Sequence, residues 1–384
     1  MQPPVPKPRY DGRSLLAVVP SLLDALGVPG FADQLRLHGP TNRVVLLMVD
    51  GLGWELLQGN RESAPFLSSI AREPISSGFP ATTAVSLSMV LTGAPPGESG
   101  MVGYTVPLPD HDRALNLLTW SLYGLGGRTD LRDRVVPEAF QPLPTLGERA
   151  AAAGVQIRHI GPPSHEGSGL TRAIGRGERF HPAASLEEVC AMALHFLRNG
   201  ARFIYGYHPA LDAAGHVYGV SSQAWRTELT MVDGTVRTLA EQLPSGTLLL
   251  LTGDHGMVDL RPDERLDLAD HPDLAAGVGL LAGEARARYI KTVAGATNDV
   301  LQAWRSRLGD RIWVWTTEEA IALGLFGPRV TDVARGRMGD IVAAAFGNVG
   351  VVQRDVDPAQ ARLQGHHGSL TAHERLVPLL VYRP

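Results

Sequence analysis

Three short segments of the chain combine carboxylate and imidazole side chains, which are the usual protein ligands of divalent metals. These segments are Asp212-Ala-Ala-Gly-His216, Asp254-His255-Gly256 and Gly365-His366-His367-Gly368. Oxygen and nitrogen donors of this kind suit divalent cations, zinc above all. Taken alone, each segment also has an ordinary explanation: a surface helix pair, a turn after a strand, or a polar loop. Their combination is what predicts a shared site.

A fourth carboxylate, Asp50, follows the apolar run from Val44 to Val49 and precedes Gly51. An apolar run without alternation is typical of a strand that is buried on both faces of a parallel sheet. Ligands of open α/β sheets bind beyond the carboxyl ends of such strands. Asp50 by itself could equally be a turn residue or a helix cap. Because the other segments also adjoin predicted strands, we expect Asp50 to face the same site.

Two hydroxyl groups, those of Thr82 and Thr83, stand where a helix is predicted to begin. Residues 84–91 have a helical pattern, and Gly93 is well placed to end the helix. The free backbone amides at a helix amino terminus favour an anion. Either threonine could instead be a simple helix cap, so this segment alone does not establish a site.

The rest of the chain alternates between predicted strands and helices, which favours a mainly parallel sheet flanked by helices. The expected strands span 44–49, 155–160, 202–207 and 247–252, and the expected helices span 146–153, 186–197 and 224–243. Residues 94–143 are predicted to form a long excursion over the surface, with some of it near the site. Beyond Leu260 the alternation stops, and a hairpin around Gly283-Glu284 with later strands at 312–315 and 341–345 predicts a smaller α+β insertion. We therefore expect an N-terminal extension with a helix (1–40), a core (41–260 and 362–384, with a last strand over 376–381) and an insertion (261–361).

Composition and charge narrow the class of protein. The chain has 384 residues, 44% of them hydrophobic, and a formal net charge of -4, which offers no field for nucleic acid polymers or anionic membranes. No apolar run reaches the roughly 18 residues that span a bilayer, and the apolar segment 15–26 lacks a cleavage site for a signal peptide. The single cysteine, Cys190, favours a reducing compartment, so a cytoplasmic location is expected, with Cys190 as a core residue.

The ordered motifs resemble those of the alkaline phosphatase superfamily, and within it the branch of type I phosphodiesterases and nucleotide pyrophosphatases. The motifs that carry this resemblance are Val49-Asp50-Gly51, Pro80-Ala-Thr-Thr83 with Thr92-Gly93 beyond it, Asp212-Ala-Ala-Gly-His216-Val-Tyr-Gly219, Asp254-His255-Gly256-Met257 and Gly365-His366-His367-Gly368. They occur in the order of the family and extend over nearly all the chain from Val44. The resemblance implies an α/β, alkaline phosphatase-like three-layer sandwich.

The resemblance also implies two divalent metal ions, usually zinc. One ion would be held by Asp212, His216 and His367. The other would be held by Asp50, Asp254 and His255, together with the hydroxyl oxygen of Thr83. The implied reaction is the hydrolysis of phosphate diesters or pyrophosphates through a phosphothreonine, with a small substrate such as a nucleotide.

Two assignments within the motifs rest on spacing in the family. Thr83 is preferred to Thr82 as the nucleophile because its distance from Thr92-Gly93 matches the family pattern. His367 is the implied ligand and His366 its neighbour, although the sequence does not separate the two.

The chain departs from the family after the nucleophile helix. Many nucleotide pyrophosphatases have an asparagine there that contacts a phosphate oxygen, but Tyr104 stands at the corresponding position. A tyrosine hydroxyl can donate one hydrogen bond, so Tyr104 is a candidate substrate-binding residue or else a packed loop aromatic. Trp54, Trp120 and Trp225 could line a slot for a nucleobase, although aromatic residues more often serve cores.

The alternatives within the superfamily are a phosphomonoesterase and a phosphonate hydrolase. A sulfatase is disfavoured, because Cys190 lies far from the nucleophile motif. From a different class, the chain could be a non-catalytic binding protein that keeps the fold, but the complete ligand set argues against this.

Overall fold

The apolar run before Asp50 forms strand β1 (Arg43–Val49), which lies inside a six-stranded sheet with the order β19-β9-β1-β8-β6-β7. The computed structural model describes residues 2–109, 111–127 and 129–384. The other strands of this sheet are β6 (Ile157–Gly161), β7 (Arg179–Pro182), β8 (Phe203–His208), β9 (Thr247–Thr252) and β19 (Leu380–Tyr382). Strands β9, β1, β8, β6 and β7 run parallel, and β19 is antiparallel to β9. The parallel strands therefore end at one edge of the sheet.

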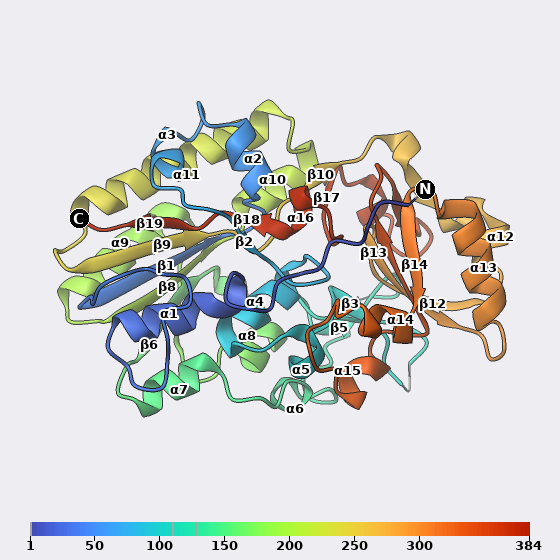
Figure 1. The fold of residues 1–384 in the computed structure, drawn as a ribbon, viewed down its shortest axis with the longest axis horizontal. Helices are drawn as coiled ribbons and strands as arrows, with labels where there is room; N and C mark the ends of the chain where they lie inside the picture. The colour runs from blue at the N-terminus through green and yellow to red at the C-terminus, as the bar shows by residue number, and fades with distance from the viewer. Residues whose placement is uncertain (1, 110, 128) are drawn as a thin grey trace.

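Helices cover both faces of this sheet, as the unbroken apolar run of β1 predicts (Figure 1). Val44, Leu46 and Met48 belong to one hydrophobic core, and the alternate residues of β1 belong to another. The first core includes residues of α1 (Val18–Ala25), α4 (Thr83–Thr92), α7 (Leu146–Ala152) and α8 (Gly169–Ile174). The second includes residues of α3 (Pro65–Ser69), α9 (Leu186–Arg198) and α11 (Gln223–Gln242). The result is a three-layer α/β sandwich.

Residues from the expected insertion form a second, four-stranded antiparallel sheet, drawn at the right of Figure 1. Its order is β12-β13-β15-β14, with β12 (Val278–Glu284), β13 (Ala287–Thr292), β14 (Ile312–Thr316) and β15 (Ile341–Ala345). One face packs on α13 (Thr297–Leu308) in a separate core, while residues such as Tyr289 join the first core of the large sheet. The expected pairing of these two strands is confirmed, but the turn lies at residues 285–286 and Gly283 and Glu284 belong to β12. The boundaries of the three expected segments stay predictions.

Two expectations about local structure are wrong. Residues 94–143 are not only a surface excursion, because Met101, Val102 and Trp120 are buried and the segment builds its own three-stranded sheet. The last strand does not run through from 376 to 381. It is divided at Pro378, which cannot donate a ladder hydrogen bond: β18 (Leu376–Val377) pairs with β2 (Ile75–Ser76), and β19 pairs with β9.

The remaining elements are short, apart from one helix that carries part of the site. That helix is α10 (Ala210–Tyr218). The short helices are α2 (Trp54–Gly59), α5 (Pro96–Ser99), α6 (Pro137–Phe140), α12 (Pro272–Ala275), α14 (Thr317–Ala322), α15 (Asp332–Gly336) and α16 (Ala372–Arg375). The short strands are β3 (Thr105–Val106), β4 (Leu115–Asn116), β5 (Ser121–Leu122), β10 (Val258–Asp259), β11 (Arg265–Asp267), β16 (Gly350–Val352) and β17 (Gly365–His366).

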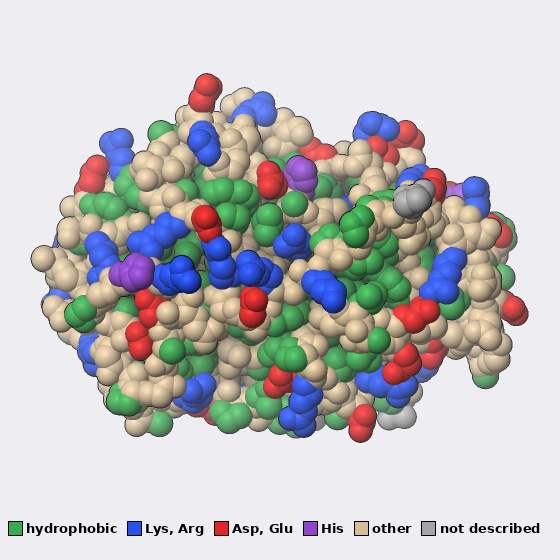
Figure 2. Space-filling view, in the orientation of Figure 1, with side chains coloured by type: hydrophobic (Ala, Val, Ile, Leu, Met, Phe, Trp, Pro, Cys, Tyr) green, Lys and Arg blue, Asp and Glu red, His purple; other side chains and the backbone are tan. Residues whose placement is uncertain are grey.

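The surface carries both signs of charge. On the face shown in Figure 2, Lys and Arg side chains form a band across the middle, with Asp and Glu side chains beside it. Exposed ion pairs of the chain include Arg9 with Asp11 and Arg354 with Asp270; such pairs each contribute about 0–1 kcal/mol to stability. Among the described helices, none has both the length and the apolar character needed to cross a bilayer.

Candidate metal and phosphate site

Asp50 and Asp254 meet because the strands that precede them are neighbours. β1 and β9 pair in parallel with Met48 opposite Thr252, so both chains leave the sheet at the same edge. The backbone amide of Gly51 donates to Oδ1 of Asp254 at 3.0 Å. Gly51 has a positive φ of 73°, and a Cβ atom there would lie 2.9 Å from Cα of Asp212. A glycine after Asp50 is therefore required for α10 to approach the strand end.

Asp50, Asp254 and His255 form the first cluster, and all three side chains are buried. Nε2 of His255 lies 3.3 Å from Oδ1 of Asp50 and 3.5 Å from Oδ2 of Asp254. Nδ1 of the same ring lies 3.1 Å from the carbonyl oxygen of Gly256. Because a carbonyl oxygen only accepts, this contact places the proton on Nδ1 and leaves the lone pair of Nε2 directed at the two carboxylates.

The second cluster joins α10 to the segment after β17. Asp212 and His216 stand one turn apart on α10, with 3.3 Å between Oδ2 of Asp212 and Nε2 of His216. His367 completes the cluster. The Nδ1 atom of His216 contacts the carbonyl oxygen of Gly365 at 2.8 Å, and that of His367 contacts the carbonyl oxygen of Ala81 at 2.9 Å. Both rings are therefore oriented as His255 is, with Nε2 free to bind a ligand.

The structure separates His367 from His366, which the sequence could not do. His366 directs Nε2 to the carbonyl oxygen of Leu363 at 3.1 Å and is not part of either cluster. The ring of His367 instead stacks on that of His255, with 3.7 Å between centroids. The two clusters are thus in direct contact.

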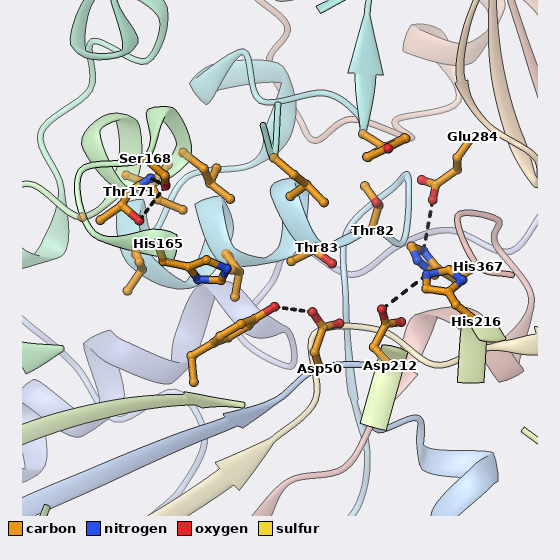
Figure 3. A pocket seen from close by; sticks show the side chains of 18 of the residues that line it. Asp50, Thr82, Thr83, His165, Ser168, Thr171, Asp212, His216, Glu284 and His367 are labelled. Carbon is orange, nitrogen blue, oxygen red and sulfur yellow. Dashed lines mark hydrogen bonds and ion pairs between the residues drawn. The ribbon is translucent and has the colours of Figure 1, made fainter. Parts of the chain in front are cut away.

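Thr83 is the first residue of α4, and Thr82 is its N-cap. Oγ1 of Thr83 lies 3.2 Å from Nε2 of His255. Both threonines line the site, and in Figure 3 the Thr83 side chain lies above Asp50. The amino terminus of α4 adds partial positive charge beside the Thr83 hydroxyl.

Burial leaves the carboxylates of the two clusters short of partners. Oδ1 of Asp50, Oδ1 of Asp212 and Oδ2 of Asp254 are buried without a hydrogen-bond partner in the described part of the chain. Burial, followed by the neighbouring carboxylates of Asp254 and Asp212, raises the pKa of Asp50 well above its usual range. Burial likewise raises the pKa of Asp212, while His216 and His255 oppose the shift. Buried carboxylates with unpaired oxygens fit two divalent cations, and so do imidazoles whose Nδ1 contacts leave Nε2 unprotonated.

A cavity of about 390 Å³ opens above the clusters, and it contains groups that the sequence motifs did not indicate. The hydroxyl of Tyr207 donates to Oδ2 of Asp50. Oε2 of Glu284, at the end of β12, lies 3.1 Å from Nδ1 of His367. The sequence could have indicated Tyr207 as a site residue, because it lies at the end of a strand beside β1. No sequence pattern indicates Glu284, because only the packing of the hairpin brings it to the cavity.

Tyr104 lines the cavity, as one of its two interpretations requires. Its hydroxyl accepts a hydrogen bond from Nδ2 of Asn116 at 2.8 Å, so the phenolic proton is free for another partner. Burial is the main cause that raises the pKa of Tyr104 to about 12, which keeps the hydroxyl protonated near neutral pH.

The tryptophans do not form a nucleobase slot. Trp120 and Trp225 are fully buried in the two cores. Trp54 is partly exposed but does not line the cavity. Cys190 is a buried core residue, as expected.

Comparison with known proteins gives the fold a family context. The sequence model of the family described as type I phosphodiesterase / nucleotide pyrophosphatase matches residues 44–370. No curated protein sequence matches the chain.

Similar solved structures cover most of the chain at low identity. Murine ectonucleotide pyrophosphatase / phosphodiesterase 5 superposes with a TM-score of 0.66 at 17% identity, covering 89% of this chain and 88% of that chain. An inactive variant of that protein in complex with AMP gives a TM-score of 0.65 at 17% identity, with 89% and 88% covered. Phosphonoacetate hydrolase from Sinorhizobium meliloti, in complex with phosphonoformate, gives 0.66 at 18% identity, with 90% and 91% covered. These likenesses confirm the alkaline phosphatase-like fold.

Proposed function

The chain belongs to the type I phosphodiesterase / nucleotide pyrophosphatase family, and from this premise we propose that it hydrolyses phosphate diesters or pyrophosphates through a phosphothreonine on Thr83. It is a hydrolase of phosphoester or pyrophosphate bonds, as the family is. The observation that carries the proposal is the position of Thr83 Oγ1, 3.2 Å from His255 Nε2 and at the amino terminus of α4.

Each cluster would hold one divalent cation, and zinc suits the donors. Asp50, Asp254 and His255, with the oxygen of Thr83, are assigned to one ion, and Asp212, His216 and His367 to the other. When bound, the two ions would supply the Lewis acidity that ionises a hydroxyl and stabilises a departing oxygen. Three carboxylates offset most of the charge of two divalent ions, which leaves net positive character for one anionic phosphate.

The side chains of the chain itself organise the reaction around Thr83. The Thr83 hydroxyl gives its proton to solvent and its oxygen attacks phosphorus while the bond to the leaving oxygen breaks, which transfers the phosphoryl group to the threonine, and the leaving oxygen takes up a proton from solvent. The free amides at the start of α4 face the phosphate oxygens that gain charge. Water then cleaves the phosphothreonine and restores the hydroxyl.

Tyr207 and Glu284 support the ligands in this scheme. The hydroxyl of Tyr207 occupies Oδ2 of Asp50 and leaves Oδ1, which has no hydrogen-bond partner in the described structure, for the cation. Glu284 and the carbonyl oxygen of Ala81 together fix the Nδ1 proton of His367. Such outer partners set the tautomer and the orientation of a metal-binding imidazole.

Tyr104 is assigned to a phosphate oxygen of the substrate. Its hydroxyl reaches the cavity, accepts from Asn116 and keeps its own proton for donation. A small phosphorylated substrate such as a nucleotide or another diester fits this arrangement, and AMP is present in one of the similar structures. The cytoplasmic location expected from the single cysteine stays a prediction.

The test is a side-by-side comparison of rates on an aryl phosphomonoester, an aryl phosphodiester and a dinucleotide pyrophosphate, with the metal content of the same preparation measured. We expect about two divalent ions per chain, as a two-metal site requires, and turnover of the diester or the pyrophosphate. Turnover by a metal-free preparation would contradict the mechanism. A preference for the monoester would favour the phosphomonoesterase alternative. Phosphonoacetate is assayed beside these three compounds, and hydrolysis of phosphonoacetate alone would favour the phosphonate hydrolase alternative.

A further inference from the structure

The cavity continues beyond Thr83 into a region that the proposed reaction does not use. We call it the distal lobe and define it by Leu87 and Leu91 of α4, Leu170, Thr171 and Ile174 of α8, and His165. Leu87 and Leu91 follow Thr83 at intervals of four residues, so the three side chains share one face of α4. In Figure 3, His165 and Thr171 lie on one side of Thr83, while Asp212, His216, His367 and Glu284 lie on the other.

This position identifies which part of a substrate the lobe receives. Under the proposed function, on which this inference rests, the leaving oxygen departs on the side opposite the Thr83 oxygen and towards the second cluster. A group in the distal lobe is therefore attached to phosphorus but does not leave. It is the substituent that stays on the phosphothreonine, which only a diester or a pyrophosphate possesses.

The lobe has no charge that could neutralise an anionic substituent. None of the described residues that line the cavity is Lys or Arg. Two imidazoles line this side of the cavity: His159 already pairs with Glu178 at 2.8 Å, and His165 is neutral near pH 7 because burial lowers its pKa to about 4. A second phosphate placed there would be buried without a counter-charge, which is strongly unfavourable.

The walls of the lobe also suit a flexible aliphatic group better than a planar base. Its flanks are the leucine and isoleucine side chains of α4 and α8. The two tyrosine rings of β8 that line the cavity already contact imidazoles: Tyr205 lies 4.5 Å from His159 and Tyr207 lies 5.3 Å from His165, between ring centroids. No Trp or Phe is among the described lining residues, so aliphatic side chains make up the apolar part of the lobe as it is defined here.

We infer that the distal lobe binds an uncharged aliphatic substituent of a phosphodiester, and that the enzyme acts on alkyl-type diesters in preference to nucleotide esters and pyrophosphates. Alkyl carbons would replace water against Leu87, Leu91 and Ile174, and each buried methylene is worth roughly a fourfold gain in affinity. The phosphate itself remains the only anionic group of the substrate.

A series of p-nitrophenyl phosphodiesters with one leaving group and different retained substituents tests this inference. We compare the methyl, butyl and thymidine 5′ esters by kcat/KM with the metal-loaded enzyme, and a dinucleotide pyrophosphate beside them. We expect the butyl ester to exceed the methyl ester by about tenfold or more, and to exceed the thymidine ester and the pyrophosphate. Equal values for butyl and methyl, or a preference for either nucleotide compound, would overturn the inference.

Matched variants locate the effect in the lobe. Thr171→Phe places a ring in the lobe from a partly exposed position of α8. The ratio of kcat/KM for the butyl ester to that for the methyl ester should then fall close to one. Thr230→Phe makes the same change at an exposed position of α11 and should leave the ratio as in the wild type. A Thr171→Phe variant that folds, by its thermal unfolding curve, and keeps the wild-type ratio would place the substituent elsewhere and overturn the inference.

A binding measurement separates this inference from the proposed function. Calorimetric titration of the metal-loaded Thr83→Ala variant with dimethyl phosphate and with butyl methyl phosphate requires no turnover. Tighter binding of the butyl compound would support substrate binding in the distal lobe, whether or not any ester is hydrolysed. If no ester is hydrolysed, only the proposed function is contradicted. Equal binding, together with turnover of the methyl ester, would retain the proposed function and remove the lobe from substrate recognition.

Discussion

The hydroxyl oxygen of Thr83 lies 3.2 Å from Nε2 of His255, although the two residues are 172 positions apart in the chain. Thr83 comes from the start of α4 and His255 from the segment after β9, so the contact joins a helix on one face of the sheet to the end of a central strand. The neighbouring Thr82 is the N-cap of the same helix and makes no such contact in the described structure. This geometry distinguishes two adjacent threonines that have the same chemistry.

The first prediction separates these two threonines. Thr83→Ala should lower kcat for an aryl phosphodiester by roughly 10³-fold or more, because removal of a covalent nucleophile leaves only binding and electrostatic catalysis. Thr82→Ala keeps the nucleophile and should retain most of the activity. Steady-state kinetics with both variants, together with thermal unfolding, provides the measurement. If Thr82→Ala were inactive and Thr83→Ala active, the assignment of the nucleophile would be wrong.

A second prediction concerns the metal content of the first cluster. Asp254→Ala removes a buried carboxylate that contacts His255, so the variant should lose at least one of about two bound ions. Mass spectrometry of the metals after dialysis measures the stoichiometry. Asp270→Ala is the matched control, since Asp270 is exposed and pairs with Arg354 at the surface. Equal metal content in wild type and Asp254→Ala would show that Asp254 is not a ligand.

Glu284 gives a third prediction, because its side chain contacts Nδ1 of His367. Glu284→Ala should weaken the binding of one ion by about 10- to 100-fold, the usual cost of removing an outer partner of a metal ligand. Glu284→Gln keeps an oxygen that can accept from His367 and should lose less. Competition with a chromophoric chelator measures the affinity, with Glu241→Gln, at the exposed end of α11, as the control. Unchanged affinity in Glu284→Ala would leave the carbonyl oxygen of Ala81 as the sufficient partner.

The fourth prediction is a dependence of stability on pH. The folded-state pKa of Asp50 is raised, so above the unfolded pKa of about 3.9 the metal-free folded protein holds a proton that the unfolded chain has lost. The contribution of Asp50 to the free energy of unfolding is therefore fully present below that pH. It is lost as the pH rises towards the folded-state pKa, by up to about 1.4 kcal/mol per pH unit. Asp50→Asn cannot ionise and avoids this loss.

Urea unfolding of chelator-treated wild type and Asp50→Asn, between about pH 5 and pH 8, isolates the contribution of Asp50. The variant should gain stability relative to wild type as the pH rises, and added Zn²⁺ should stabilise the wild type more than the variant. A difference that stays constant over this range would show that Asp50 is ionised throughout in the metal-free protein.

Much of the fold follows from local patterns in the sequence. The apolar run before Asp50 indicated a strand covered on both faces, and its residues do alternate between two cores. Gly93 ends α4 with a positive φ of 69°, as a glycine after a helix predicts. These features depend on neighbouring residues, so they could be predicted. The division of the last strand at Pro378 was also open to prediction, because a proline has no N–H group to donate to a neighbouring strand.

What the sequence by itself indicated is the set of candidate metal-binding side chains, apart from the choice between two adjacent histidines, because motif order and the edge at which parallel strands finish place these side chains together. Only the tertiary structure decided between His366 and His367, because the choice depends on which imidazole meets the backbone of Ala81. It also brought Tyr207 and Glu284 into contact with the clusters, built the distal lobe, and placed the tryptophans outside the cavity lining. Contacts between segments far apart in the chain leave no local signal, and the walls of this cavity are built from such contacts.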